Sequence, residues 1–251
     1  MDTVRLVNKL YEDETTLIKP SSILSKEEID KDNYLLSSFY FGIDRIRLVT
    51  PQFLIGSSKS IGPITSNDVS EYVIGLIQEQ GRALVMFDSF HNIIVKPLFE
   101  KRFLSSGELR SIPFGLYNFI KPRPNDLNIQ ESYRPNLPIL IVEGLRDCLL
   151  LQQIYPYTLA MQTAGIPSQI KMVLNTLTNN LILGFDEDEA GMKAYNSVKY
   201  NTSFNISKLS YHPYKDGGTL SELYLKDSFK YQLFRSSLLT QLTILSKNIK
   251  Y

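Results

Sequence analysis

Two groups of acidic residues in the second half of the chain could do chemistry together. Glu143 directly follows the apolar run 139–142, and four consecutive acids at 186–189 directly follow the apolar run 181–185. Carboxylates gathered in one place repel one another unless a cation lies between them. Hard oxygen ligands of this kind suit Mg²⁺ or Mn²⁺. The sequence therefore indicates a divalent-metal site, provided that the two segments meet in the fold.

The four consecutive acids are not expected to be equivalent. In an extended or turning segment alternate side chains point the same way, so Asp186 and Asp188 are predicted to face Glu143. Glu187 and Glu189 are then predicted to face solvent. A run of acids after a strand can also simply favour the start of a helix, through the helix dipole. The order of the two acidic groups and their separation of about 40 residues favour the metal site over this simpler interpretation.

Alternating strands and helices are needed to position these acids, and the chain from residue 139 onward has that pattern. Such alternation predicts right-handed βαβ units, a parallel sheet and an α/β domain. In open parallel sheets, ligands collect beyond the carboxyl ends of the strands, where both acidic groups would lie if their strands are neighbours. Thr219 and Glu222 have the spacing of a capping box. Strands are expected at 139–142, 158–161, 181–185 and 206–212, and helices at 146–154, 167–177, 190–200 and from 218.

The first half of the chain has a different pattern, and the complete chain is expected to be α+β. Short apolar runs at 47–57, 82–88 and 92–100 predict strands, and helices are expected within 1–35 and at 66–81. Four prolines and few apolar residues at 121–138 are typical of a linker. We predict an α+β basic subdomain at 1–120, a linker at 121–136, the α/β domain at 137–225 and a helical tail at 226–251.

Composition excludes several classes of protein. Hydrophobic residues make up 43% of the 251 residues and charged residues 21%, with a net charge of +1, as in ordinary globular proteins. A single cysteine, Cys148, excludes a Cys-rich zinc site and is expected in the core, so no zinc is predicted. His91 and His212 have no obvious catalytic partners. The acidic start is unlike a signal peptide, and no apolar run approaches the roughly 18 residues of a membrane span, which indicates a cytoplasmic protein without membrane partners.

The two acidic segments, IVEGLRD (141–147) and GFDEDEAGMKA (184–194), resemble the Toprim domain. That domain is shared by DnaG-like primases, phage primase-helicases, type IA and II topoisomerases and some nucleases. Its strand-terminal Glu-Gly and later Asp-x-Asp match Glu143-Gly144 and Asp186-x-Asp188. The resemblance covers about 137–225 and favours the primase branch, because of the small helix after Asp188, the TAGIPS turn (163–168) and the segment YKDGGTLSELYL (214–225). In that last segment Asp216 fits, but Gly218 stands where many primases have a second acid.

The resemblance implies roles for individual residues. Glu143, Asp186 and Asp188 would be catalytic and would bind metal together with Asp216, and Glu143 could instead act as the general base. Basic residues would hold nucleotide or template phosphates, although scattered lysines and arginines usually form only a solvated face. Supporting roles would belong to Asp147, Gly144 and Gly191, and phosphate binding to Lys96, Lys101, Arg102, Arg110, Lys193 and Lys215.

The function implied is that of a DNA primase catalytic core. Such a core uses Mg²⁺ or Mn²⁺, with room for two or more ions, to make short RNA primers from NTPs on a single-stranded DNA template during replication. The alternatives are a Toprim-type metal-dependent nuclease and a non-catalytic replisome or nucleic-acid-binding subunit; a topoisomerase would need further domains. The sequence contains no Walker A motif, so a separate replicative helicase or a zinc-bearing initiation subunit is the expected partner. A compact primase of this kind would suit the cytoplasm of a bacterium or of a phage-infected host.

Overall fold

The computed structural model describes two compact units, Met1–Leu109 and Arg110–Tyr251, and each is described by itself. In the first unit it describes four strands, and in the second it describes residues 113–116, 138–161 and 166–247. The predicted linker at 121–136 and the predicted helices within 1–35 and at 66–81 lie outside the described residues.

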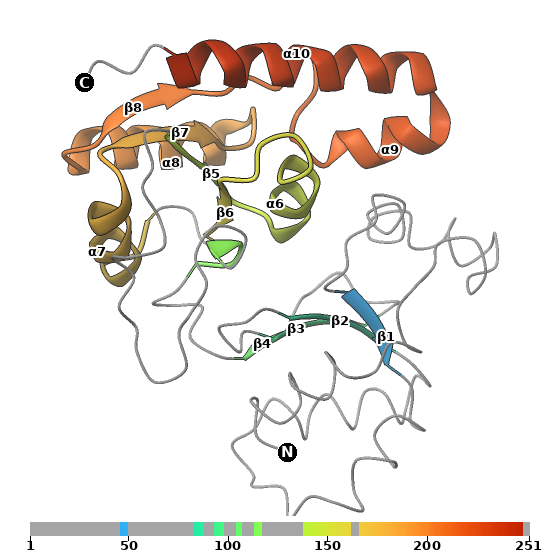
Figure 1. Ribbon diagram of the computed structural model, residues 1–251, viewed down its shortest axis with the longest axis horizontal. Helices are drawn as coiled ribbons and strands as arrows, with labels where there is room; N and C mark the ends of the chain where they lie inside the picture. The colour runs from blue at the N-terminus through green and yellow to red at the C-terminus, as the bar shows by residue number, and fades with distance from the viewer. Residues whose placement is uncertain are drawn as a thin grey trace, which may run out of the picture. The chain divides into compact units, whose positions relative to one another are not determined.

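The first unit contains a four-stranded antiparallel sheet (Figure 1). Its order is β1 (Ile46–Val49), β2 (Ala83–Phe87), β3 (Ile93–Pro97) and β4 (Leu104–Ser106). In the register of β2 and β3, the Val85 backbone lies opposite Val95 and the Met86 backbone lies opposite Ile94. The strands predicted within 82–88 and 92–100 are confirmed, and β1 confirms the beginning of the one predicted at 47–57.

The second unit contains a four-stranded sheet in which every neighbouring pair is parallel, as predicted. The order is β6 (Thr158–Ala160), β5 (Ile139–Val142), β7 (Asn180–Gly184) and β8 (Asn205–Lys208). All four residues of β5 are fully buried, because helices cover a parallel sheet on both faces. Val142 pairs with Gly184, so the two strands that precede the acids are neighbours.

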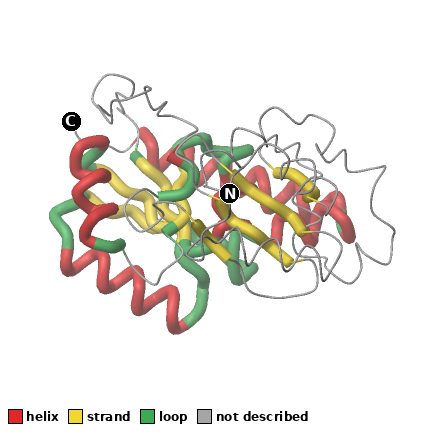
Figure 2. The backbone as a smooth tube through the Cα atoms, turned by 90° about the horizontal axis from the view of Figure 1, so that it is seen from below, coloured by secondary structure: helices red, strands yellow, loops and turns green. Residues whose placement is uncertain are grey.

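Three helices connect these strands: α6 (Leu145–Leu151), α7 (Ser168–Leu177) and α8 (Glu189–Asn201). The chain leaves β5 toward β6 on one side but leaves β7 toward β8 on the other. Right-handed crossovers therefore place α6 on one face of the sheet and α7 and α8 on the opposite face. The Lys171 ammonium of α7 donates to the Asn201 carbonyl of α8 at 3.3 Å, as expected for helices on the same face. Figure 2 shows helices lying beside the strands.

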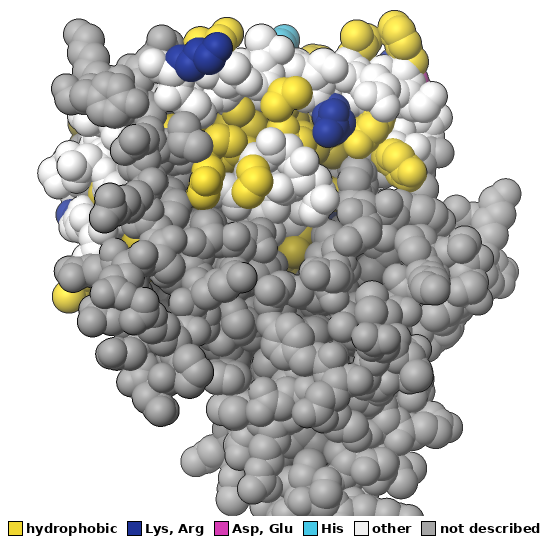
Figure 3. All heavy atoms as spheres, in the orientation of Figure 1, with side chains coloured by type: hydrophobic (Ala, Val, Ile, Leu, Met, Phe, Trp, Pro, Cys, Tyr) yellow, Lys and Arg dark blue, Asp and Glu magenta, His cyan; other side chains and the backbone are white. Residues whose placement is uncertain are grey.

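Two further helices, α9 (Thr219–Lys226) and α10 (Ser228–Lys247), complete the second unit and confirm the predicted helical tail. One stripe of α10 is buried, with Leu238 fully inaccessible, and its spacing of three or four residues is that of a helix packed on a core. Hydrophobic side chains also reach the surface of this unit (Figure 3). The buried stripe consists of Tyr231, Phe234, Leu238 and Leu242, and the exposed apolar residues of α10 are Phe229, Leu233, Leu239 and Ile244.

The capping box predicted at Thr219 and Glu222 is wrong. Thr219 is the first residue of α9, and the N-cap position is Gly218, which has no side chain to cap the helix. The Thr219 amide instead donates to Asp216 Oδ1 at 2.9 Å, so an acid three residues earlier supplies the acceptor.

None of the described helices combines the length and the hydropathy that a membrane span requires.

Candidate active site

The acidic groups lie at the point where the chain changes direction across the second sheet. Glu143 follows β5, and Asp186 follows the adjacent strand β7 after one intervening residue. The connection from β5 runs toward β6 and that from β7 toward β8, so the two connections diverge. Such a switch point is where open parallel sheets bind their ligands. The predicted meeting of the two segments is therefore confirmed, and the Asp186 amide donates a hydrogen bond to Glu143.

Glu143 is a half-buried carboxylate among other negative charges. Burial raises its pKa, and the charges of Asp186 and Asp188 raise it further. Its Oε1 atom is buried and accepts no hydrogen bond from the described residues. A buried carboxylate oxygen without a donor is costly, and a cation is the partner that would offset that cost.

Asp186 and Asp188 share one lysine. The Lys215 ammonium lies 3.0 Å from Asp188 Oδ2 and 3.7 Å from Asp186 Oδ2. Burial and the neighbouring charge of Asp216 raise the pKa of Asp186. The pKa of Asp188 is lowered by its bond from the Gly191 amide and by Lys215. Asp188 is also the N-cap of α8, so the simpler interpretation of the acidic run holds for this residue, and its metal-binding role stays a prediction.

Gly191 allows the backbone of the acidic loop to approach α8 closely. A Cβ atom at this position would lie 2.9 Å from both the amide nitrogen and the carbonyl carbon of Asp186, closer than side chains approach backbone. The supporting role predicted for Gly191 thus has a steric basis. Gly144 holds the corresponding N-cap position of α6, and its carbonyl accepts from the Cys148 amide at 3.1 Å.

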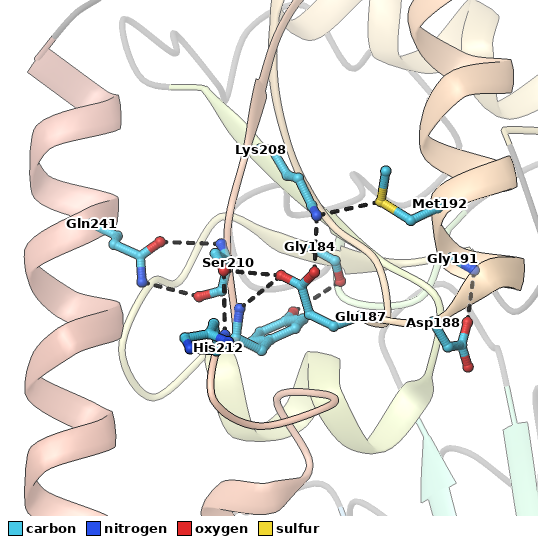
Figure 4. A network of polar contacts seen from close by, with 10 residues as sticks. Gly184, Glu187, Asp188, Gly191, Met192, Lys208, Ser210, His212 and Gln241 are labelled. Atoms are coloured by element: carbon cyan, nitrogen blue, oxygen red, sulfur yellow. Dashed lines mark hydrogen bonds and ion pairs between the residues drawn. The ribbon is translucent and has the colours of Figure 1, made fainter.

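The prediction that Glu187 faces solvent is wrong (Figure 4). Its carboxylate accepts from Lys208 Nζ at 2.9 Å, from Ser210 Oγ at 3.0 Å and from the Tyr211 amide at 3.2 Å. Burial alone would raise the pKa of Glu187, but these three donors outweigh it and lower the pKa. The expectation that alternate side chains point the same way fails because the loop turns here, where the Glu187 amide donates to the Lys215 carbonyl. Glu189, in contrast, is 84% exposed as predicted.

Arg146 was not among the residues predicted from the sequence, yet it is buried in the cluster and only 5% exposed. Its Nη2 atom lies 3.6 Å from Asp216 Oδ1, and its Nη1 atom lies 3.9 Å from Glu222 Oε1. Asp147 is also buried, and burial with the charge of Asp216 raises its pKa to about 7 although Arg146 acts in the opposite direction.

Within the described part of the chain, no three acidic, histidine or cysteine side chains lie close enough together to form a ready-made metal site. Lysine and arginine side chains accompany these acids instead: Lys215 pairs with Asp186 and Asp188, and Arg146 pairs with Asp216. The chemistry of the donors nevertheless suits a divalent ion, because Glu143 offers an unpartnered buried oxygen beside two further carboxylates.

The remaining predicted residues fall into two groups. Lys193 lies on the exposed side of α8 and pairs with Glu189 at 2.6 Å, so its predicted phosphate contact stays a prediction. Lys96 belongs to β3 but its side chain is outside the described residues, as are Lys101, Arg102 and Arg110. Cys148 is fully buried, as predicted, and His212 is exposed.

With this geometry in place, a family model described as Toprim-like matches residues 140–219. The second unit contains a Toprim-like domain. The match spans Glu143, Asp186, Asp188 and Asp216. The comparison with curated proteins found no significant match.

Several solved structures share the fold. The DnaG primase catalytic domain bound to single-stranded DNA superposes with a TM-score of 0.54 and 15% identity, over 96% of this chain and 81% of that chain. The RNA polymerase domain of Mycobacterium tuberculosis primase DnaG superposes with a TM-score of 0.54 and 14% identity, over 94% of this chain and 83% of that chain. The zinc-binding and RNA polymerase domains of the Aquifex aeolicus primase superpose with a TM-score of 0.56 and 15% identity, over 94% of this chain and 60% of that chain. At these identities the likeness establishes the Toprim fold of DnaG-type primase cores.

Proposed function

We propose that this chain is the catalytic core of a DNA primase, a metal-dependent nucleotidyltransferase that makes short RNA primers on single-stranded DNA. The observation that carries the proposal is the convergence of Glu143, Asp186 and Asp188 at the switch point of a Toprim-like domain. Several kinds of enzyme share the Toprim domain. The structural likeness to DnaG primase cores, which extends over most of both chains, favours a primase among them.

The three carboxylates would hold a Mg²⁺ or Mn²⁺ ion. When bound, such an ion neutralises phosphate charge and favours ionisation of the attacking 3′-hydroxyl. Glu143 supplies the buried oxygen without a donor, while Asp186 and Asp188 supply carboxylates now paired with Lys215. The general-base role predicted for Glu143 remains the alternative to its role as a ligand.

Lys215 is the basic residue best placed to bind a nucleotide phosphate. Its side chain is 60% exposed and already lies against Asp186 and Asp188. A flexible lysine stem allows its ammonium to leave these carboxylates for a phosphate oxygen when the metal takes its place. The predicted DNA contacts of Lys96, Lys101, Arg102 and Arg110 would be contacts to phosphate, which are largely independent of base sequence.

A nuclease would use the same acids, and a non-catalytic subunit would not need them. One assay separates the three functions: the protein is incubated with single-stranded DNA, labelled NTPs and Mg²⁺ or Mn²⁺. We expect short labelled RNA; cut DNA would favour the nuclease, and neither product would favour the non-catalytic subunit. Dependence on a helicase or a zinc-bearing partner is tested by adding those proteins to the same reaction.

We predict that replacing either Asp186 or Asp188 by Asn lowers primer synthesis by more than about 100-fold, because the metal loses a charged ligand. The matched control is Glu189→Gln, which alters an exposed acid of the same run and should leave synthesis unchanged. Circular dichroism and thermal unfolding verify that the variants are folded. Substantial synthesis by folded Asp186→Asn and Asp188→Asn would remove this assignment of the metal ligands.

A further inference from the structure

A buried arginine lies inside the acidic cluster and has no part in the function proposed above. Arg146 projects from α6 and is 5% exposed, with its guanidinium 3.6 Å from Asp216 Oδ1. Its charge also acts on the carboxylates of Asp147 and Asp186. One side of the cluster, formed by Asp147 and Asp216, thus already has a cation.

Gly218 makes room for this cation. A Cβ atom at Gly218 would collide with the Nη2, Nε and Cζ atoms of Arg146, so the guanidinium fills the space that a side chain would need. The Gly218 amide donates to Asp147, which keeps the backbone against the buried carboxylate. An arginine at 146 and a glycine at 218 are therefore sterically dependent on each other.

The two sides of the cluster differ in how easily their cations can leave. A guanidinium stays charged at every ordinary pH, and Arg146 is buried and held beside two carboxylates. Lys215, on the other side, is 60% exposed, and water can solvate its ammonium once it is displaced. A divalent ion placed beside Asp216 would also be repelled by the guanidinium a few ångströms away.

We propose that Arg146 is a permanent cation for Asp147 and Asp216, and that the cluster consequently binds a single divalent ion, at Glu143, Asp186 and Asp188. Asp216 then positions Arg146 and the start of α9 and is not a metal ligand. The inference rests on the proposed function only in taking the metal site as given.

The number of bound ions tests the proposal without any measurement of activity. The full chain is titrated with Mn²⁺, and free Mn²⁺ is followed by electron paramagnetic resonance. We expect saturation at one ion per chain. Saturation at two ions would overturn the role of Arg146 but leave the metal-dependent function intact. No saturable binding would overturn the metal site itself and the proposed function with it.

Variants extend the test to the residue responsible. The double variant Arg146→Met with Gly218→Asp removes the cation and adds an acid in the vacated space, and it should bind a second Mn²⁺ ion. Arg146→Lys keeps the charge and Glu222→Gln removes only an exposed partner, so both should bind one. A folded double variant that binds one ion would overturn the proposal. If the double variant does not fold, two ions in wild type or in Arg146→Lys would overturn it.

Discussion

The adjacent acids at 186–189 occupy four different environments. Asp186 is partly buried near Asp216, Glu187 accepts three hydrogen bonds, Asp188 caps α8, and Glu189 is solvated and pairs with Lys193. These differences arise because the loop turns between β7 and α8, so each step of one residue changes the direction of the side chain. Whether an acid in this run is buried, accepts hydrogen bonds, caps a helix or is solvated therefore depends on its position in the turn.

Gly191 is the residue on which the position of Asp186 depends. We predict that Gly191→Ala, which forces a Cβ against the Asp186 backbone, displaces this carboxylate. A displacement of about 1 Å would lower primer synthesis by roughly 100-fold. Steady-state primer synthesis measures the effect, and Asn196→Ala, on the exposed side of the same helix, is the control. Equal activity of Gly191→Ala and wild type would mean that the loop tolerates the added atom.

At the scale of elements, Glu187 joins three segments that are distant in the sequence. Its carboxylate holds Lys208 of β8 and Ser210 beyond it, and its amide donates to the Lys215 carbonyl at 2.7 Å. Ser210 in turn exchanges two hydrogen bonds with Gln241 of α10, at 3.1 and 3.0 Å. The acidic loop is therefore tied to the carboxy-terminal helix through one carboxylate.

We predict that Glu187→Gln destabilises the protein by about 1 kcal/mol at neutral pH, because its hydrogen bonds are no longer charge-assisted. The folded state lowers the pKa of Glu187 from its ordinary value of 4.5, so its contribution is complete above that pH. The contribution disappears as the pH falls through the lower folded value. Urea unfolding between pH 3 and pH 8 should show wild type and variant converging at the acidic end. A constant difference would exclude ionisation of Glu187 as its cause.

The packing of α10 is tested by two adjacent leucines. Leu238 is fully buried, and Leu239 is 44% exposed. We predict that Leu238→Ala lowers the free energy of unfolding by about 2–5 kcal/mol, because it leaves a cavity. Leu239→Ala, with the same change in side chain, should cost less than about 1 kcal/mol. Chemical denaturation measures both, and similar decreases would show that α10 is not packed by this stripe.

At the scale of the whole molecule, the acids lie in the second unit, whereas three of the predicted template-binding residues lie in the first and Arg110 begins the second. We predict that single-stranded DNA binds more weakly as salt increases. Replacing Lys96, Lys101, Arg102 and Arg110 together by Ala should reduce the slope of log affinity against log salt by about 0.7 for each phosphate that the protein no longer neutralises. Fluorescence anisotropy with labelled oligonucleotides measures this, with Lys193→Ala as a single-charge comparison. An unchanged slope would assign DNA binding to other residues.

The strands and helices of the second unit, and the place of the acids, were predictable from the amino-acid sequence. A buried parallel strand is typically a continuous apolar run, and a polar residue directly after it lies at the carboxyl end of the strand. The run 139–142 followed by Glu143 could therefore be interpreted from the sequence alone. The same reasoning located Asp186 and Asp188 after β7.

Which charges pair within the cluster could be learned only from the folded chain. Glu187 was predicted to face solvent because local alternation says nothing of Lys208 and Ser210, which reach it from another strand and the segment beyond it. Arg146 was overlooked for the same reason, since its burial depends on a glycine about 70 residues later in the chain. Hydrophobic periodicity is a local property that one segment reveals, whereas the partner of a buried charge is chosen by the packing of segments distant in sequence.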